Sequence, residues 1–263
     1  MERDQTALYH ISPEEILSRL KTDVLPLDVF CFESIDSTND EAKRRFRNGL
    51  RSRALFVADS QTNGHGRRGR SFYSPSLTGI YLSLLFPLNN GRTDFLSFTS
   101  RTAVAVCRAL TGVYSVFPRI KWVNDILLNG KKIAGILSEF VSDSCSGDSA
   151  VVIGIGINLS TEVFPDAISN TAGSVGNTDI PRSAAAAAVA EELILLLNDA
   201  DPSYLDEYRS LNCVLGNRIT YERTGTVYCG TAVSIDPDAA LVVLRNDGIT
   251  DVLNTGEITV RTV

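Results

Sequence analysis

The sequence contains few of the residues on which metal centres, disulfide scaffolds and membrane spans depend. Its 263 residues include two histidines and five cysteines, and no two cysteines form a C-x-x-C pair. An odd, scattered set of cysteines is typical of a reduced protein, and two histidines are too few for a His-rich catalytic metal site. No apolar run approaches the roughly 20 residues of a membrane helix, and the polar N-terminus is unlike a signal peptide. We therefore expect a soluble, cytoplasmic protein with no disulfides, no metal site and no membrane contact.

A surplus of basic residues is also missing, because 31 acidic residues stand against 25 lysines and arginines and give a formal net charge of −6. This balance disfavours a general nucleic-acid binder, although it allows a local basic site. With 44% hydrophobic residues, the composition excludes a disordered chain, a collagen-like repeat and a disulfide scaffold. The length indicates one large domain, or one domain with a small appendage.

The pattern along the chain predicts an α/β domain followed by a β-rich unit. Ser12 to Glu15 form a capping box with Pro13 at the first helical position. Further helices are expected after Ser37, from about Phe95 to Leu110 with Gly112 ending the helix, and over 181–198 and 203–211. Strands are expected over 29–33, 55–59, 80–86, 119–123, 126–128, 133–141 and 151–157, and then over 218–221, 226–233, 240–244, 249–254 and 258–261. We expect an N-terminal helical segment over 1–28, a main domain over 29–215, and a small β barrel over 216–263.

A loop rich in glycine and arginine, Gly64 to Arg70, is the most informative segment. Its letters contain G-x-G-x-x-G, but a dinucleotide fingerprint must open a helix, and here Ser71 to Pro75 and a strand follow. Glycines let backbone N–H groups approach an anion, and arginines hold phosphate oxygens bidentately. The loop therefore indicates an anion site, and the alternative is a flexible exposed turn with solvated arginines.

Three other clusters carry polar residues at strand or helix ends. Lys121 to Asp125 contain the only tryptophan, and either place a fixed positive charge in a partly apolar pocket or form an ordinary turn. Ser37 to Asn39 cap a helix, which leaves some of them able to contact a ligand. The glycines of Gly154 to Asn158 either admit a ligand or allow tight packing of a helix on the sheet.

Taken in order, these segments resemble the biotin protein ligases, from about Val29 to the C-terminus. The matching motifs are S-T-N at 37–39, Gln61 followed by G-H-G-R-R-G at 64–69, K-W-V-N-D at 121–125, K-I-A-G-I-L at 132–137 and G-I-G-I-N at 154–158. The resemblance implies a class II synthetase-like domain, with a central mixed β-sheet and helices on one side, and a C-terminal SH3-like barrel.

The resemblance also implies a reaction and its partners. Biotin and ATP, with Mg²⁺ on the phosphates, would give biotinyl-5′-AMP and pyrophosphate. The biotinyl group would then pass to one lysine of a biotin carboxyl carrier domain of a carboxylase such as acetyl-CoA carboxylase. The resemblance leaves a homodimer open, and implies no covalent enzyme intermediate.

Carried over motif by motif, the resemblance implies a set of site residues. Lys121 and Arg67 would be catalytic, because fixed cations neutralise charge as a carboxylate meets a triphosphate. The residues implied for biotin are Ser37, Thr38, Asn39, Gln61, His65, Gly66, Arg67, Lys121 and Gly135. Gly156 would also give room for the bicyclic ring. The residues implied for ATP and the adenylate are Arg67, Arg70, Phe72, Tyr73 and Asn158.

The chain departs from the usual motifs at two positions. His65 stands where the family has an arginine, which exchanges a permanent cation for a side chain type that titrates near neutral pH. Val123 replaces a proline, and we expect a looser turn there. About 30 residues precede the main domain, too few for the helix-turn-helix of DNA-binding relatives, so we expect no nucleic-acid binding. The alternatives are a lipoate or octanoate ligase of the same superfamily and a non-catalytic biotin sensor.

Overall fold

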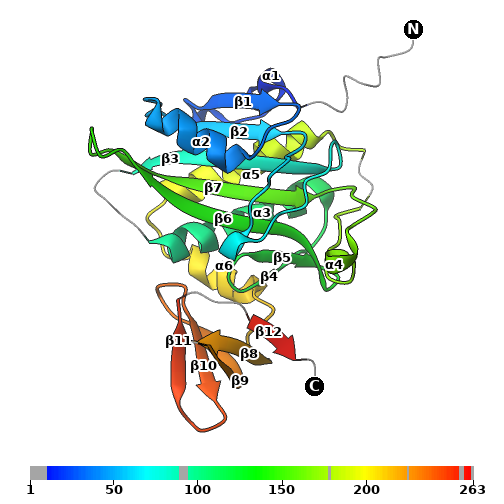
Figure 1. Cartoon of the computed structure of the whole chain (residues 1–263), viewed down its shortest axis with the longest axis vertical. Helices are drawn as coiled ribbons and strands as arrows, with labels where there is room; N and C mark the ends of the chain where they lie inside the picture. Colours follow the sequence, from blue (N-terminus) through cyan, green and yellow to red (C-terminus); the bar gives the residue numbers. More distant parts are fainter. Residues whose placement is uncertain (1–10, 89–93, 177–178, 224, 255–257, 262–263) are drawn as a thin grey trace.

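The computed structural model describes residues 11–88, 94–176, 179–223, 225–254 and 258–261, and contains two β-sheets (Figure 1). The first sheet has seven strands in the order β1-β2-β3-β7-β6-β5-β4. Their bounds are β1 (Asp28–Phe32), β2 (Ala54–Ala58), β3 (Gly79–Leu88), β7 (Ser149–Asn158), β6 (Lys131–Ser142), β5 (Asp125–Leu128) and β4 (Arg119–Lys121). Strands β1 and β2 are parallel, whereas the other neighbours are antiparallel. The predicted mixed central sheet is therefore confirmed.

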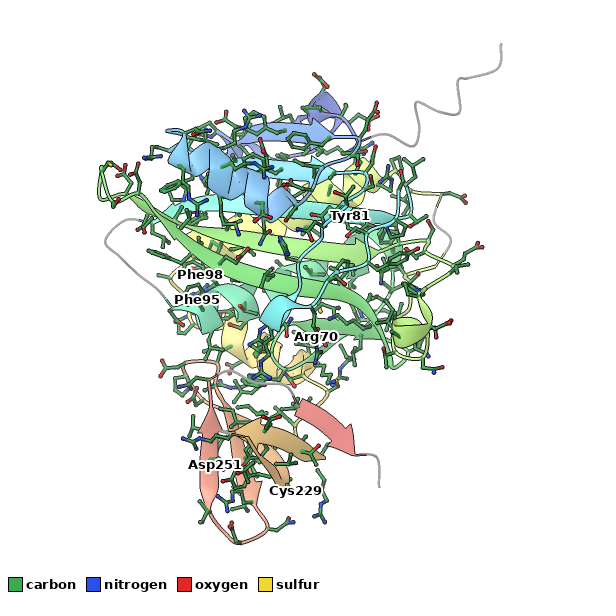
Figure 2. All side chains as sticks on the ribbon, in the orientation of Figure 1. Arg70, Tyr81, Phe95, Phe98, Cys229 and Asp251 are labelled. Carbon is green, nitrogen blue, oxygen red and sulfur yellow. The ribbon has the colours of Figure 1, made fainter. Side chains whose placement is uncertain are left out.

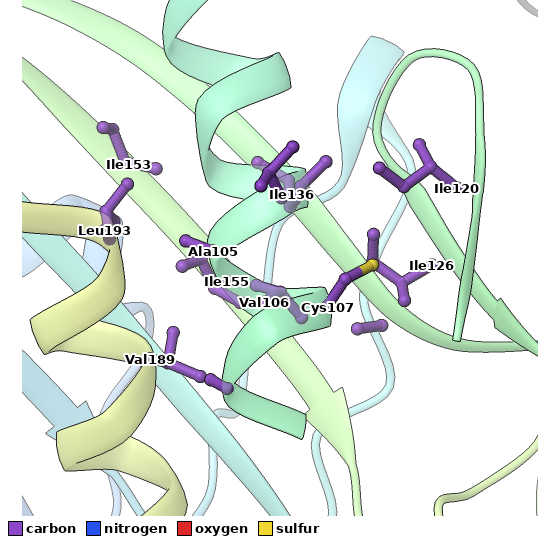
Figure 3. Packing of buried hydrophobic residues seen from close by; sticks show 14 of the residues in the cluster. Ala105, Val106, Cys107, Ile120, Ile126, Ile136, Ile153, Ile155, Val189 and Leu193 are labelled. Carbon is purple, nitrogen blue, oxygen red and sulfur yellow. The ribbon is translucent and has the colours of Figure 1, made fainter. Parts of the chain in front are cut away.

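Helices cover both faces of this sheet. Helices α3 (Phe95–Tyr114) and α5 (Arg182–Asn198) pack on one face, where the apolar side chains of Ile153 and Ile155 join the main core (Figure 3). Helix α2 (Thr38–Arg47) lies on the opposite face and buries Phe46 against Phe56 and Val152. The implied placement of helices on one side is thus wrong for α2, because successive strand residues point to opposite faces and both faces carry apolar residues here.

The remaining helices are short, and one helix end differs from its prediction. They are α1 (Pro13–Leu17), α4 (Asp166–Ser169), α6 (Tyr204–Leu211) and the 3₁₀ turns η2 (Thr22–Val24) and η3 (Arg67–Gly69). The N-cap at Ser12 is confirmed, since Ser12 Oγ accepts the Glu15 N–H at 3.2 Å. The prediction that Gly112 ends its helix is wrong. Helix α3 continues through this glycine and stops at Ser115, whose left-handed conformation (φ 54°) ends the helix.

The second sheet is antiparallel and confirms the predicted β-rich C-terminal unit. Its order is β11-β10-β9-β8-β12, with β8 (Arg218–Arg223), β9 (Thr226–Ile235), β10 (Leu241–Arg245), β11 (Thr250–Leu253) and β12 (Ile258–Arg261). Asp251 and Cys229 mark this unit in Figure 2. The unit is joined to the first sheet by the indole of Trp122, which donates to the Ala239 carbonyl at 3.0 Å. The barrel form and the boundary near Leu215 stay predictions.

None of the helices in the described ranges is both long enough and apolar enough to cross a membrane.

Candidate active site

Three glycines form a floor on the face of the sheet that carries α2. Gly135 of β6 pairs with Gly156 of β7, and Gly154 lies two residues from Gly156 on the same face. A Cβ atom on Gly154 would lie 2.2 Å from Asn39 Oδ1, and one on Gly156 would lie 2.3 Å from Phe72 Cε1. A larger residue at either position would therefore displace a neighbour, since side chains from α2 and from the glycine–arginine loop rest directly on the backbone.

The N-terminal turn of α2 forms one wall beside this floor. Ser37 caps the helix, and the Thr38 N–H and hydroxyl both donate to Gln61 Oε1, at 2.9 and 3.1 Å. Gln61 Nε2 donates in turn to Ser74 Oγ at 3.0 Å. The predicted helix cap is thus confirmed for Ser37, and Thr38 and Asn39 line the inner pocket, where their contact with a ligand stays a prediction.

The glycine–arginine loop forms a small hairpin, which we call the arginine hairpin (residues 64–72). Its backbone is closed by hydrogen bonds from the Phe72 N–H to the Gly64 carbonyl (2.8 Å) and from the Gly66 N–H to the Arg70 carbonyl (2.7 Å). The single 3₁₀ turn η3 forms its tip, and no α-helix begins there. The rejection of a dinucleotide fingerprint is therefore confirmed. The tip is oriented toward the side of the sheet that meets the C-terminal unit, where Figure 2 labels Arg70.

Two joined pockets lie between the hairpin and the sheet. The inner pocket, over the glycine floor, has about 50 Å³ of free volume, and the outer pocket has about 480 Å³. Five residues line both pockets: Gly66, Arg67, Phe72, Asn124 and Lys132. A smaller and a wider pocket thus adjoin one another, and two cations belong to the lining that they share.

The cations at the junction are held by neighbouring polar groups. Arg67 Nη1 donates to Asn124 Oδ1 at 3.1 Å, and Lys132 Nζ lies 2.6 Å from Asp125 Oδ1. Asn124 is fixed in turn, since its Nδ2 donates to the Ile136 carbonyl at 3.0 Å. The peptide bond between Trp122 and Val123, just before this turn, is cis. The K-W-V-N-D segment thus places Asn124 at the junction of the pockets and Asp125 beside Lys132 on the outer side.

The predicted site residues divide between the two pockets. Those that line the inner pocket are Ser37, Thr38, Asn39, Gln61, His65, Gly66, Arg67 and Gly135, together with Gly156. Those that line the outer pocket are Gly66, Arg67, Arg70, Phe72, Tyr73, Asn158 and Lys121, and Gly66, Arg67 and Phe72 line both pockets. Lys121 lines only the outer pocket, although the resemblance also implied it for biotin. Phe72 was expected over adenine, but its ring rests on Gly156 and reaches both pockets.

Lys132 is a residue at the junction that the sequence motifs did not single out. It begins the K-I-A-G-I-L motif, but the adjacent Lys131 carries the same charge, and only the strand register decides which of the two faces the pockets. Lys131 instead bonds the Asn170 carbonyl away from the junction. Phe164, from the loop before α4, was also missed. Its ring contacts that of Tyr73 edge-on, with centroids 6.3 Å apart, at the outer pocket.

Asn158 has an unused acceptor at the outer pocket. Its Nδ2 donates to the Gly173 carbonyl at 3.0 Å, whereas its Oδ1 is buried with no hydrogen-bond partner among the described residues. The residue is 5% exposed. A buried acceptor without a partner is costly, so a ligand donor at this point would be recognised.

A group of charged residues lies behind the inner pocket. Asp40 of α2 contacts His65 Nε2 at 2.8 Å and Lys43 Nζ at 2.9 Å. Burial raises the pKa of the Asp40 carboxyl, but hydrogen bonds from Lys43 and His65 outweigh this effect, and the pKa lies below its ordinary value.

In the described ranges, no three His, Cys, Asp or Glu residues gather in a way that could hold a metal ion.

Comparison with known proteins shows the family to which the chain belongs. Residues 31–158 match the model of the biotin/lipoate A/B protein ligase family. The chain is 30% identical over 234 residues to the biotin--[acetyl-CoA-carboxylase] ligase of Mycobacterium tuberculosis, which covers 84% of this chain and 85% of that protein. It is 29% identical over 252 residues to the bifunctional ligase/repressor BirA of Bacillus subtilis, which covers 91% and 76% respectively.

The chain therefore belongs to the biotin protein ligases of this family. A solved structure supports the fold: the biotin protein ligase of Aquifex aeolicus, in complex with biotin and ATP, is 24% identical. The two structures align with a TM-score of 0.75 over 90% of this chain and 99% of the other.

Proposed function

We propose that the chain is an ATP-dependent biotin protein ligase that works in two steps. In the first, a carboxylate oxygen of biotin attacks the α-phosphorus of ATP, the bond to the β-phosphate breaks, and pyrophosphate leaves. In the second, a lysine amine of a carrier domain attacks the acyl carbon of biotinyl-5′-AMP. The bond to AMP breaks and the amine loses a proton. The observation that carries the proposal is the pair of joined pockets with Arg67 and Lys132 at their junction.

The inner pocket suits the fused rings of biotin. Its glycine floor lacks side chains and so admits a flat ring system. The hydroxyls of Ser37 and Thr38 and the amide of Gln61 supply hydrogen bonds that the ureido group needs once it leaves water. The free volume of about 50 Å³ is smaller than such a ligand, so the Phe72 ring has to leave Gly156 when biotin enters.

The junction suits the reacting groups. A carboxylate and a triphosphate repel one another, and fixed cations lower the barrier by neutralising the negative charge that accumulates as they meet. Arg67 and Lys132 line both pockets and are the candidates for this role. Lys121, Arg68 and Arg70 line only the outer pocket, where they would bind the phosphates of MgATP.

The outer pocket suits the nucleoside. Asn158 Oδ1 is free to accept a hydrogen bond from the 6-amino group of adenine. Tyr73 and Phe164 provide aromatic surface beside it. With the hairpin over both pockets, the mixed anhydride of the adenylate would be shielded from water.

The acceptor proposed for the second step is the biotin carboxyl carrier domain of a biotin-dependent carboxylase. The names of the relatives from Mycobacterium tuberculosis and Paracoccus denitrificans, both biotin--[acetyl-CoA-carboxylase] ligases, support this choice.

The first step is tested by exchange of labelled pyrophosphate into ATP. The exchange should depend on biotin and should not be supported by lipoate or octanoate. Exchange with lipoate and not with biotin would overturn the proposal in favour of a lipoate ligase. Binding of biotin by calorimetry without any exchange would instead indicate a non-catalytic biotin sensor.

A further inference from the structure

A circuit of hydrogen bonds and ion pairs runs beside the inner pocket and begins and ends on the arginine hairpin. Each contact measures between 2.5 and 3.1 Å. In order, the circuit runs through His65, Asp40, Lys43, Glu139, Asn39, Ser83, Thr38, Gln61, Ser74 and the carbonyl of Phe72. The wall of the pocket and the hairpin that covers it are thus connected by one network.

Within this circuit, His65 is the one hairpin residue that contacts a charged side chain of α2. The two hairpin strands are bridged at His65 and Ser71, so a force on His65 acts on the whole hairpin, including Arg67 and Phe72. On the other side the hairpin is held by Arg67, which donates to Asn124. Two of the contacts that hold the hairpin on the sheet domain thus come from opposite sides, one from α2 and one from the turn between β4 and β5.

The charges next to His65 in the circuit are predominantly negative. Asp40 and Glu139 carry two negative charges, and Lys43, which contacts both, supplies one positive charge. A protonated imidazole would complete the balance and convert a hydrogen bond into an ion pair. Arg67 and Lys132 line the same inner pocket and would repel a charged imidazole. The contact is partly exposed, with 36% of the His65 side chain and 28% of the Asp40 side chain accessible, so its effect is modest.

We propose that His65 and Asp40 are positioning residues that hold the arginine hairpin over the inner pocket, more tightly when His65 is protonated. The consequence for the reaction is slower escape of biotinyl-5′-AMP at lower pH, and this consequence rests on the proposed function. The effect on the hairpin itself does not depend on the proposed function. His65 thus performs, with its partner on α2, a pH-dependent version of what a permanent cation would do at this position.

The hairpin is tested in ligand-free protein by hydrogen exchange of the Gly66 and Phe72 amides, whose hydrogen bonds close it. After correction for the intrinsic pH dependence of exchange, protection should be about two- to fivefold greater at pH 6 than at pH 8, as befits a partly exposed ion pair. His65→Arg should be protected at both pH values. His65→Gln, which keeps a neutral donor, should show the lower protection at both.

The matched control is the next carboxylate on α2. Asp40→Asn should abolish the pH dependence. Glu41→Gln also removes a carboxylate from the first turn of α2, but this carboxylate contacts Arg44 and Arg45 and not His65. Glu41→Gln should therefore behave as the native protein. Equal protection of the native hairpin at pH 6 and pH 8, or the same loss in both variants, would overturn the proposal.

A second measurement extends the test to the reaction intermediate. Release of biotinyl-5′-AMP from the enzyme should be about two- to fivefold faster at pH 8 than at pH 6 in the native protein, and independent of pH in His65→Arg. If no adenylate forms, the proposed function fails while the exchange experiment still decides the role of His65. If adenylate forms and its release is the same at both pH values, the consequence for the reaction is wrong.

Discussion

Replacing Gly156 with alanine should damage the inner pocket without affecting the backbone. The added Cβ would lie 2.3 Å from Phe72 Cε1 and 2.6 Å from Cζ, whereas ordinary contact begins at 3.4 Å. The ring must therefore retreat by about 1 Å, and overpacking of this kind typically costs about 1–3 kcal/mol. The methyl group occupies the glycine floor whether the Phe72 ring or the biotin ring lies over it, so the affinity for biotin should fall as well. If the same 1–3 kcal/mol is lost from the free energy of biotin binding, the dissociation constant for biotin rises about 5- to 150-fold.

Chemical denaturation gives the free energy of unfolding of Gly156→Ala, and titration calorimetry gives its affinity for biotin. The control is Gly112→Ala in α3, where an added Cβ meets nothing within 4 Å. This variant should gain about 0.5–1 kcal/mol of stability, because alanine is a better helix former, and should bind biotin unchanged. Native stability together with native biotin affinity in Gly156→Ala would refute the placement of biotin on the glycine floor.

Three further variants test the junction, the outer pocket and a surface ion pair. Lys132→Met should slow biotin-dependent pyrophosphate exchange by about 10²–10³-fold, which is the usual effect of removing a charge partner of the transition state. Lys121→Met should slow the exchange less. If Lys121→Met has the larger effect, the charge at the junction belongs to Lys121. Asn158→Ala should lower the preference for ATP over GTP by about 1–3 kcal/mol in kcat/KM, and an unchanged ratio would exclude its contact with adenine. A hydrogen bond from Arg44 lowers the pKa of Asp36 to about 2, so the pair is lost as the pH falls through that value. In Arg44→Ala the carboxyl should titrate nearer its ordinary pKa of about 3.9 by NMR, and an unshifted titration would contradict the pairing.

Much of the fold could be predicted from local patterns. The capping box at Ser12 and the Asn129-Gly130 turn between β5 and β6 are short-range signals, and their elements form where expected. The end of α3 could not be predicted in this way. Gly112 is tolerated inside the helix, and the helix ends only at Ser115, whose left-handed conformation has no local signal because serine rarely adopts it.

The site was predictable as a set of motifs, but not as a geometry. Charge does not distinguish Lys131 from Lys132, and although Lys132 begins the K-I-A-G-I-L motif, the motif does not say which lysine faces the pockets. That depends on the strand register, which shifts between β5 and β6 near Leu127. The partner of His65 was also hidden, since Asp40 lies 25 positions away and has the sequence context of an ordinary residue in the first turn of a helix.

The central claim is that the joined pockets activate the carboxylate of biotin for transfer to a protein lysine. The most direct measurement is the intact mass of a biotin carboxyl carrier domain after incubation with the protein, biotin and MgATP. We expect a gain of one biotinyl group on one lysine, none without ATP, and none when lipoate replaces biotin. An unmodified carrier domain, with a protein that binds biotin and is folded, or a gain of a lipoyl group, would contradict the account.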